Sequence, residues 1–75
     1  MIREQVPSSN ILSVGYDPST RTMEVEFGDD PRFAGRIYHY FDVPPEVHRG
    51  LMTAESHGKF LHEHVMWKFS YKYLG

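Results

Sequence analysis

Two short aromatic segments carry the residue types that could recognise a ligand. The first is Tyr38-His39-Tyr40, and the second runs from Trp67 to Tyr73, where aromatic residues alternate with Lys68, Ser70 and Lys72. Rings that share one face of a sheet can stack on unpaired bases, and nearby cations can contact phosphates. These segments therefore suggest recognition of single-stranded nucleic acid.

Tyr38 and Tyr40 also have a second interpretation. They share one face of a strand, and Ile37, His39 and Phe41 share the other. In a small domain both tyrosine rings can pack into the core, with their hydroxyls at its rim. His39 favours this arrangement because an ionisable ring is easier to leave in water, whereas Ile37 and Phe41 favour the opposite one. We favour the core interpretation, and the register of the strand decides between the two.

The C-terminal run is open to the same choice. Its alternation of aromatic and polar residues is typical of a strand with one aromatic face. Such a terminal strand would complete a small core, and its lysines would protect the sheet edge from aggregation. The same texture is found on surfaces that bind single-stranded nucleic acid. We favour the structural role and keep the binding role as the alternative.

No catalytic or metal site is predicted. His62-Glu63-His64 has a superficially metal-binding composition, but helical residues two apart point about 200° from each other and cannot share one ion. Ser56 beside His57 is expected to cap a helix rather than act as a nucleophile. We expect surface histidines, with His64 partly packed, no cofactor and no enzymatic activity.

The composition is that of one small domain. The chain has 75 residues, no cysteine and a formal charge of −2, which argues against nonspecific coating of nucleic acid. Residues 51–75 are mildly basic, with three lysines against two acids. No signal peptide or bilayer-spanning run is evident. We expect a cytoplasmic protein with neither a membrane nor a small-molecule partner.

The elements that must position these groups are a three-stranded antiparallel meander followed by two short helices on one face, an α+β fold. Residues 1–9 are expected to be a loosely held tether. Ile11–Tyr16 and Thr22–Phe27 form the first hairpin, joined by a turn over Asp17–Thr20. In the first strand Leu12, Val14 and Tyr16 are expected to share one face, with Ile11 and Ser13 on the other. In the second strand the apolar face of Met23, Val25 and Phe27 is expected to be buried.

A long loop is expected over Gly28–Gly35, with Phe33 at its tip. Gly35–Pro45 then supplies the third strand and leads into a helix over residues 43–54, whose prolines suit a first helical turn. Ser56 begins a second helix. The tail is an extended aromatic segment and a possible fourth strand.

Several segments together resemble the KTSC domain, across roughly residues 8–73. In chain order they are Ser8-Ser9-Asn10-Ile11, Val14-Gly15-Tyr16-Asp17, Met23/Val25/Phe27, Tyr38-His39-Tyr40, Val43-Pro44 and Ala54-x-Ser56-x-Gly58-x-Phe60. The domain is named for the C-terminus of some lysyl-tRNA synthetases and also exists as a stand-alone bacterial or phage protein. The resemblance implies no established activity, and RNA binding is the role suggested for the family. Two departures are a longer Asp29–Ala34 loop and Leu61 in place of an expected Asn.

Two functional hypotheses follow. The first is a non-enzymatic module that binds tRNA or single-stranded RNA on the helical and C-terminal side, away from Glu24 and Glu26. Its candidate residues are Tyr38, Tyr40, Trp67 and Tyr71 for stacking, and Arg36, Lys59, Lys68 and Lys72 for phosphates. The alternative is a protein-interaction adaptor or regulator, phage- or prophage-encoded, that uses the acidic first half and an exposed sheet edge and binds no nucleic acid.

Overall fold

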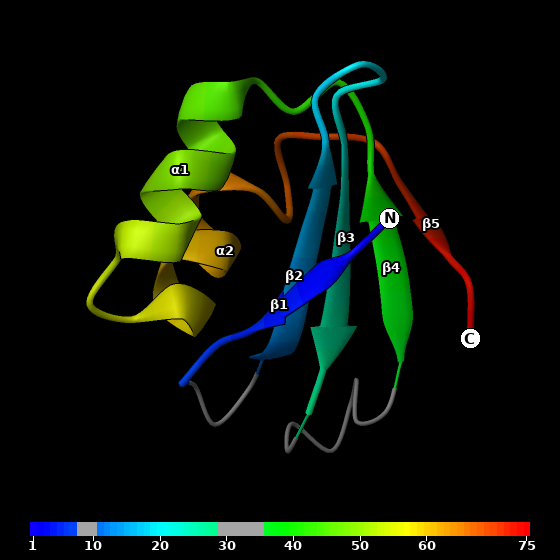
Figure 1. The fold of residues 1–75 in the computed structure, drawn as a ribbon. Coiled ribbons are helices and arrows are strands. Elements are labelled where there is room, and N and C mark those ends of the chain that lie inside the picture. The colour runs from blue at the N-terminus through cyan, green and yellow to red at the C-terminus, as the bar shows by residue number, and fades with distance from the viewer. Residues whose placement is uncertain (8–10, 29–35) are drawn as a thin grey trace.

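The computed structural model describes residues 1–7, 11–28 and 36–75 and shows an antiparallel sheet with two helices. The elements are β1 (Arg3–Gln5), β2 (Ile11–Asp17), β3 (Thr22–Phe27), β4 (Ile37–Tyr40), α1 (Pro45–Thr53), α2 (His57–His64) and β5 (Tyr71–Tyr73). The five strands lie in chain order, β1-β2-β3-β4-β5. Both helices lie to one side, and β5 forms the edge remote from them (Figure 1). The predicted α+β class is confirmed, and the tail adds a strand to the meander.

The N-terminal segment is an edge strand. β1 pairs antiparallel with β2, and Arg3 lies opposite Gly15. A Cβ at position 15 would lie 2.9 Å from the Ile2 carbonyl oxygen, so only glycine allows this close approach. The prediction of a loose tether is therefore wrong for residues 3–5. A strand of three residues is too short to produce a recognisable alternation. The expected loop around Phe33 lies outside the described residues.

A bulge in β2 changes which residues face the core. Ile11 pairs with Phe27 and Ser13 pairs with Glu26, so Leu12 is an extra residue on the β2 side. Ile11 is consequently fully buried, whereas Leu12 is 45% exposed. The prediction that Leu12 shares a face with Val14, opposite Ile11, is wrong, because strict alternation along a strand holds only where no residue is inserted.

The core lies between the sheet and the helices. It is formed by Ile11, Val14, Met23, Val25, Phe27, Tyr40, Val43, Leu51, Leu61 and Val65. The predicted inward face of β3 is thus confirmed. Leu61, where the resemblance implies an Asn, is one of these core residues, so no polar role remains at that position.

The chain turns sharply between β4 and α1. Asp42 has φ of 58°, a left-handed conformation that aspartate tolerates better than most residues. The Val43 amide then donates to the Arg21 carbonyl at 2.9 Å, which fixes the connection against the β2–β3 turn. Pro44 precedes α1 and Pro45 begins it, as the preference of proline for the first helical turn predicts.

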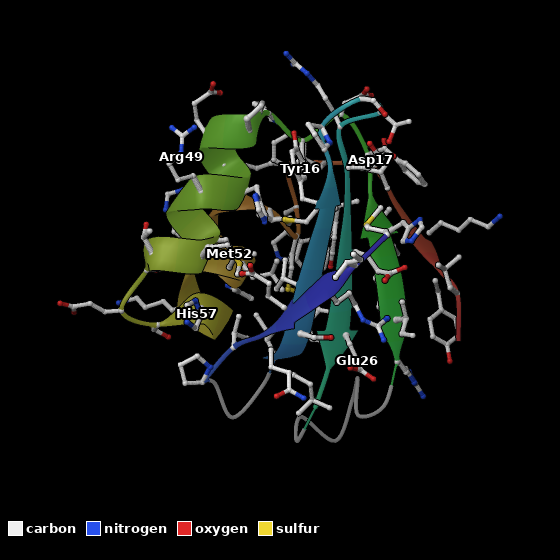
Figure 2. All side chains as sticks on the ribbon, viewed as in Figure 1. Tyr16, Asp17, Glu26, Arg49, Met52 and His57 are labelled. Atoms are coloured by element: carbon white, nitrogen blue, oxygen red, sulfur yellow. The ribbon has the colours of Figure 1, made fainter. Side chains whose placement is uncertain are left out.

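The two helices meet at a glycine and at a histidine. A Cβ at Gly50 would lie 2.7 Å from Cζ of Phe60. The missing side chain at Gly50 therefore lets the Phe60 ring of α2 pack closely against α1. The Ser56 hydroxyl accepts from the backbone amide of Lys59 at 3.2 Å and confirms the predicted cap. His57, beside the turn between the helices (Figure 2), donates from Nδ1 to the carbonyl of Leu51 at 2.7 Å. The prediction of a surface histidine is wrong here, because this bond lets His57 be buried.

The C-terminal segment is a strand only in its last part. Residues 65–69 form turns that follow α2, and the amide of Phe69 donates to the Val65 carbonyl at 3.2 Å. Tyr71–Tyr73 then pairs with β4. The prediction of a continuous strand is therefore wrong for Trp67, which lies in the turns. Within the described residues, neither helix is long and apolar enough to span a bilayer.

Candidate functional site

Four tyrosines form a ladder across β4 and β5. Tyr38 lies opposite Tyr73 and Tyr40 lies opposite Tyr71, so all four side chains share one face of the sheet. The ring centroids are 5.2 Å apart for Tyr38–Tyr73, 5.8 Å for Tyr38–Tyr71 and 6.2 Å for Tyr40–Tyr71. These separations are typical of aromatic pairs in contact. We call these four residues the tyrosine ladder.

The ladder is buried on its β4 side and open on its β5 side. Tyr40 is 3% exposed, and the partly buried ring of Tyr38 meets Phe27 edge-on at 5.5 Å. Tyr71 and Tyr73 are 58% and 50% exposed. The core interpretation of the β4 tyrosines is confirmed. The hypothesis that Tyr40 offers its ring for stacking is wrong, because the core and β5 cover it.

Trp67 extends the exposed rings beyond β5. It is 78% exposed and stands in the turns after α2. With Tyr71 and Tyr73 it forms what we call the edge patch, and Leu74 adds a further exposed apolar side chain. Single exposed apolar residues are common, but a contiguous group often marks an interaction site.

A small slot opens inside the edge patch. Its walls are Tyr38, Tyr40, Met66, Trp67 and Tyr71, and its volume is about 80 Å³. The slot therefore joins the buried rings of β4 to the exposed rings of the tail.

Two cations border the edge patch. The guanidinium carbon of Arg36 lies 5.6 Å from the centroid of the Tyr73 ring, which is within cation–π range. Lys68 lines a shallow hollow together with Trp67 and Tyr71. Aromatic and basic groups thus lie together at this edge.

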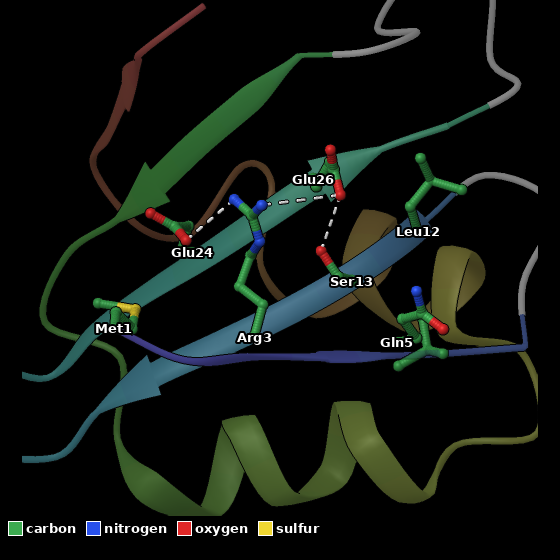
Figure 3. A pocket seen from close by; sticks show the side chains of 8 residues that line it. Met1, Arg3, Gln5, Leu12, Ser13, Glu24 and Glu26 are labelled. Atoms are coloured by element: carbon green, nitrogen blue, oxygen red, sulfur yellow. Dashed lines mark hydrogen bonds and ion pairs between the residues drawn. The ribbon is translucent and has the colours of Figure 1, made fainter.

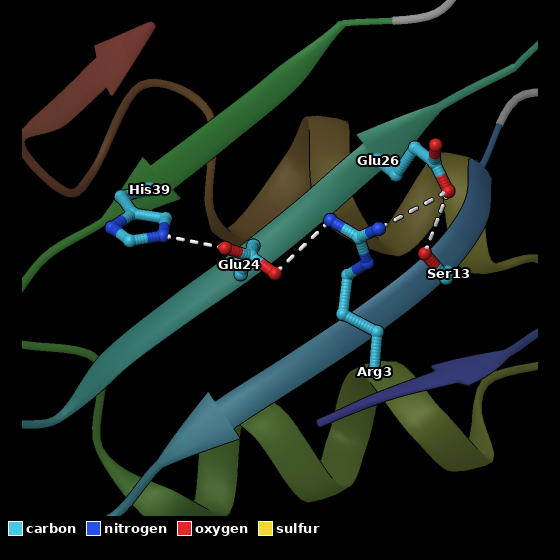
Figure 4. Close-up of polar contacts among 5 residues, drawn as sticks. All are labelled: Arg3, Ser13, Glu24, Glu26 and His39. Atoms are coloured by element: carbon cyan, nitrogen blue, oxygen red, sulfur yellow. Dashed lines mark hydrogen bonds and ion pairs between the residues drawn. The ribbon is translucent and has the colours of Figure 1, made fainter. Parts of the chain in front are cut away.

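The opposite face of the sheet, which we call the outer face, carries a polar network (Figure 4). Arg3 donates from Nη1 to Oε2 of Glu24 at 3.1 Å, and its Nη2 lies 3.9 Å from Oε1 of Glu26. Ser13 donates to Oε1 of Glu26 at 3.0 Å. His39 lies at 2.8 Å from Oε1 of Glu24. Each of the five side chains is thus bound to another member of the network.

This network borders a shallow depression over β1, β2 and β3 of about 750 Å³, into which Arg3 points (Figure 3). Burial alone would raise the pKa of Glu24. The hydrogen bond from His39 and the charge of Arg3 outweigh it, so the pKa of Glu24 lies below its ordinary value. A general acid or base works best with a pKa near the working pH. The carboxylate is instead held ionised, and its geometry suits it to tie β1 to β3.

The histidine-rich end of α2 has no metal-binding geometry. In the part of the chain that the structure describes, no three His, Asp or Glu side chains are grouped to hold an ion. His64 lies 4.5 Å from the Phe60 ring by centroid, which agrees with its predicted partial packing.

Comparison with known proteins places these features in a family. A model of the KTSC domain matches residues 7–69. The chain belongs to the KTSC domain family. A KTSC domain protein from Yersinia pestis, known as a crystal structure, has 38% identity and a TM-score of 0.88, over 99% of this chain and 97% of that one. The five-stranded architecture is therefore that of a solved family member.

Two further relatives differ in size. An uncharacterized protein from Stutzerimonas stutzeri is 40% identical over 63 residues, which is 84% of this chain and 82% of that protein. A lysine–tRNA ligase from Nostoc is 36% identical over 66 residues, which is 88% of this chain and 11% of the ligase. The KTSC domain thus occurs both in short proteins and as a small part of a much longer one.

In this KTSC domain, only some of the predicted site residues lie together. Arg36, Trp67, Lys68 and Tyr71 are at the edge patch. Lys72 is on the outer face, because it lies opposite His39. Lys59 lines a separate hollow on α2. Of the two lysines in the tail, Lys68 therefore lies at the edge patch and Lys72 does not.

Tyr73 and Met66 belong to the site but were not among the predicted site residues. Tyr73 lies two residues after Tyr71 and therefore on the same face of the strand, so the alternation in the sequence was enough to identify it. Met66 had no such signal, because its place in the slot depends on the turns that follow α2.

Proposed function

We propose that this KTSC domain binds single-stranded RNA through the edge patch. The observation that carries the proposal is the grouping of three exposed rings, Trp67, Tyr71 and Tyr73, with Arg36 and Lys68 at their margins. Stacking of a base on an aromatic side chain contributes about 1–3 kcal/mol and tolerates different sequences. Cations beside the rings contribute contacts to phosphates.

The relationship to lysine–tRNA ligases supports RNA as the partner. Those proteins carry a related segment of 66 residues, and their name states a tRNA substrate. A domain attached to such an enzyme is well placed to hold an unpaired region of the tRNA. The same surface on a short protein would bind the same chemical features without the ligase.

Electrostatics favours the edge patch over the outer face. Glu24 and Glu26 stand on the outer face, where their carboxylates would repel phosphates even though Arg3 offsets part of the charge. RNA is therefore expected to approach the side of the sheet that carries the tyrosine ladder, and to avoid the depression beside β1.

A binding titration tests the proposal. A labelled single-stranded RNA decamer and a tRNA would be titrated with the protein at low ionic strength. Trp67→Ala is expected to weaken binding about 5- to 150-fold, the range set by one stacked base. Lys68→Ala is expected to weaken binding and to reduce its dependence on salt.

Lys59→Ala is the matched control, because Lys59 is an exposed lysine that borders a different hollow. It is expected to bind RNA as the unmodified protein does. The proposal fails if neither RNA binds at low salt, or if Lys59→Ala and Lys68→Ala weaken binding equally.

A protein partner is the second candidate, and the open edge of β5 favours it. The Ser70 carbonyl accepts a hydrogen bond from the residue after β4 at 2.9 Å, and the Leu74 amide donates one to β4 at 2.8 Å. Because hydrogen-bonded pairs alternate along antiparallel strands, the backbone groups of Tyr71 and Tyr73 point away from β4. A partner strand would slow hydrogen exchange at these two amides, whereas stacked RNA would leave it unchanged.

A further inference from the structure

The slot in the edge patch is built from three parts of the chain. Tyr38 and Tyr40 come from β4, Tyr71 from β5, and Met66 and Trp67 from the turns after α2. Its β4 wall is firmly held, because Tyr40 is buried and contacts both Tyr38 and Tyr71. Trp67, in contrast, keeps most of its ring open to a ligand. The slot thus combines a rigid floor with an accessible stacking surface.

The size of the slot limits what can enter it. The slot is small, with a volume of about 80 Å³. A single six-membered ring can enter such a space by its edge. The two fused rings of a purine are longer and would leave one ring outside, so the size favours a pyrimidine.

The lining suits a neutral planar ring. The wall residues are three tyrosines, one tryptophan and one methionine, and none of them carries a charge at neutral pH. Of these walls, the exposed rings of Trp67 and Tyr71 can contact the faces of a planar ring favourably, as in other sites for unpaired bases. Burial raises the pKa of the Tyr40 phenol, and Tyr38 and Tyr71 add to the effect, so its hydroxyl stays protonated.

Cations lie at both ends of the ladder that leads to the slot. Arg36 covers Tyr73, which pairs with Tyr38. The next rung on the same face, formed by Tyr40 and Tyr71, lies about 7 Å further along the strands, since each residue rises about 3.4 Å. Lys68 borders the hollow beside Trp67 and Tyr71, next to this second rung. A nucleotide with its base in the slot would therefore have a cation near the phosphate on each side.

We infer that the slot receives one unpaired pyrimidine base of a single-stranded RNA, with Trp67 stacked on it and Arg36 and Lys68 on the flanking phosphates. The inference rests on the proposed function and names the substrate class of the same surface. It adds a preference between bases, which stacking on an open patch would not produce.

Tryptophan fluorescence tests the inference at the slot itself, because Trp67 is the one tryptophan of the chain. Decamers of uridine, of adenosine and of abasic ribose would be titrated against the protein at one low salt concentration. The uridine decamer is expected to quench the fluorescence with a Kd at least fivefold lower than that of the adenosine decamer. The abasic decamer has the same charge and is expected to quench weakly.

The outcomes separate the two proposals. Equal or tighter binding of adenosine, with quenching of Trp67, overturns the pyrimidine slot and leaves RNA binding at the patch intact. Absence of binding by all three decamers overturns both. Equal affinity of the abasic decamer also overturns the slot, since it would mean that only phosphates are contacted.

Two variants sharpen the result. Met66→Ala enlarges the slot and is expected to improve binding of adenosine, which brings the ratio of the two Kd values close to one. Leu74→Ala, an exposed apolar residue outside the slot, is the matched control and is expected to keep the ratio. Tyr71→Ala removes an exposed wall and is expected to weaken uridine binding more than adenosine binding. An unchanged ratio in folded Met66→Ala and Tyr71→Ala variants, verified by circular dichroism, contradicts the inference.

Discussion

The outer face and the edge patch use their side chains in opposite ways. On the outer face, Arg3, Glu24 and His39 have the chemistry usually sought in an active site, yet they are bound to one another. At the edge patch, Trp67 and Tyr71 have the chemistry of a core, yet they stand largely in water. A search for reactive residue types alone would have chosen the outer face, where these groups already bind one another.

The contrast has a physical reason. Charged groups that neutralise each other within the protein have little left to offer a ligand, and they stabilise the edge strand instead. Removing exposed aromatic rings from water by burying them against a partner is favourable. Polar groups that already bind one another therefore indicate a structural role, whereas a contiguous exposed apolar surface indicates recognition.

The largest expected difference is in stability, between substitutions on the buried and on the exposed side of the tyrosine ladder. Tyr40→Ala is expected to lower the free energy of unfolding by about 3 kcal/mol, because it empties a buried site. Tyr71→Ala is expected to cost less than about 1 kcal/mol, as is usual for exposed positions. Urea denaturation measures both. Equal losses would mean that Tyr71 is as much a core residue as Tyr40, and would remove the basis for the edge patch.

Disrupting the attachment of β1 to the sheet is expected to have a smaller effect on stability, and this effect concerns the outer face. Gly15→Ala places a Cβ against the Ile2 backbone and is expected to cost about 1–3 kcal/mol, the range for overpacking. Because the clash is with backbone, β1 is expected to detach and release Arg3 from Glu24. Faster hydrogen exchange in residues 3–5 would report the detachment. If the variant keeps both its stability and its exchange rates, β1 does not depend on this close approach.

The smallest effect concerns pH. The pKa of Glu24 is lowered in the folded state, so its contribution to stability is complete above the ordinary pKa of 4.5 and is lost as the pH falls through the folded value. Unfolding free energies from pH 7 to pH 3 are expected to fall less steeply in Glu24→Gln than in the unmodified protein. Glu63→Gln, an exposed carboxylate on α2, serves as the control. Parallel curves for the Glu24 variant and the unmodified protein would show that the network does not favour the ionised carboxylate.

Local features were predictable where one short segment decides the outcome. The alternation of Met23, Val25 and Phe27 identified the buried face of β3, and Ser56 identified the start of α2. Both depend on neighbours in the sequence, through strand parity and through the capping of free amides. The family resemblance depended on the order of such segments and was likewise accessible from the sequence.

The errors arose where a distant segment decides the outcome. The bulge at Leu12 depends on the register between β2 and β3, and the burial of His57 depends on a carbonyl of the preceding helix. The alternation in the tail was real, but the turns after α2 removed Trp67 from the strand. Of the candidate residues chosen by type, only some consequently lie together in the structure.

The sequence by itself determined the α+β class and the presence of an aromatic and basic tail, because these follow from composition and local periodicity. It also indicated the family, through the resemblance of its ordered segments to the KTSC domain. Only the tertiary structure decided which of these groups lie together. Pairing of β5 with β4 places Tyr71 and Tyr73 beside the buried tyrosines and directs Lys72 to the outer face, since opposite residues in an antiparallel pair share a side. This register places the alternating aromatic residues of the tail at the sheet edge, where they are exposed and border the slot beside Trp67.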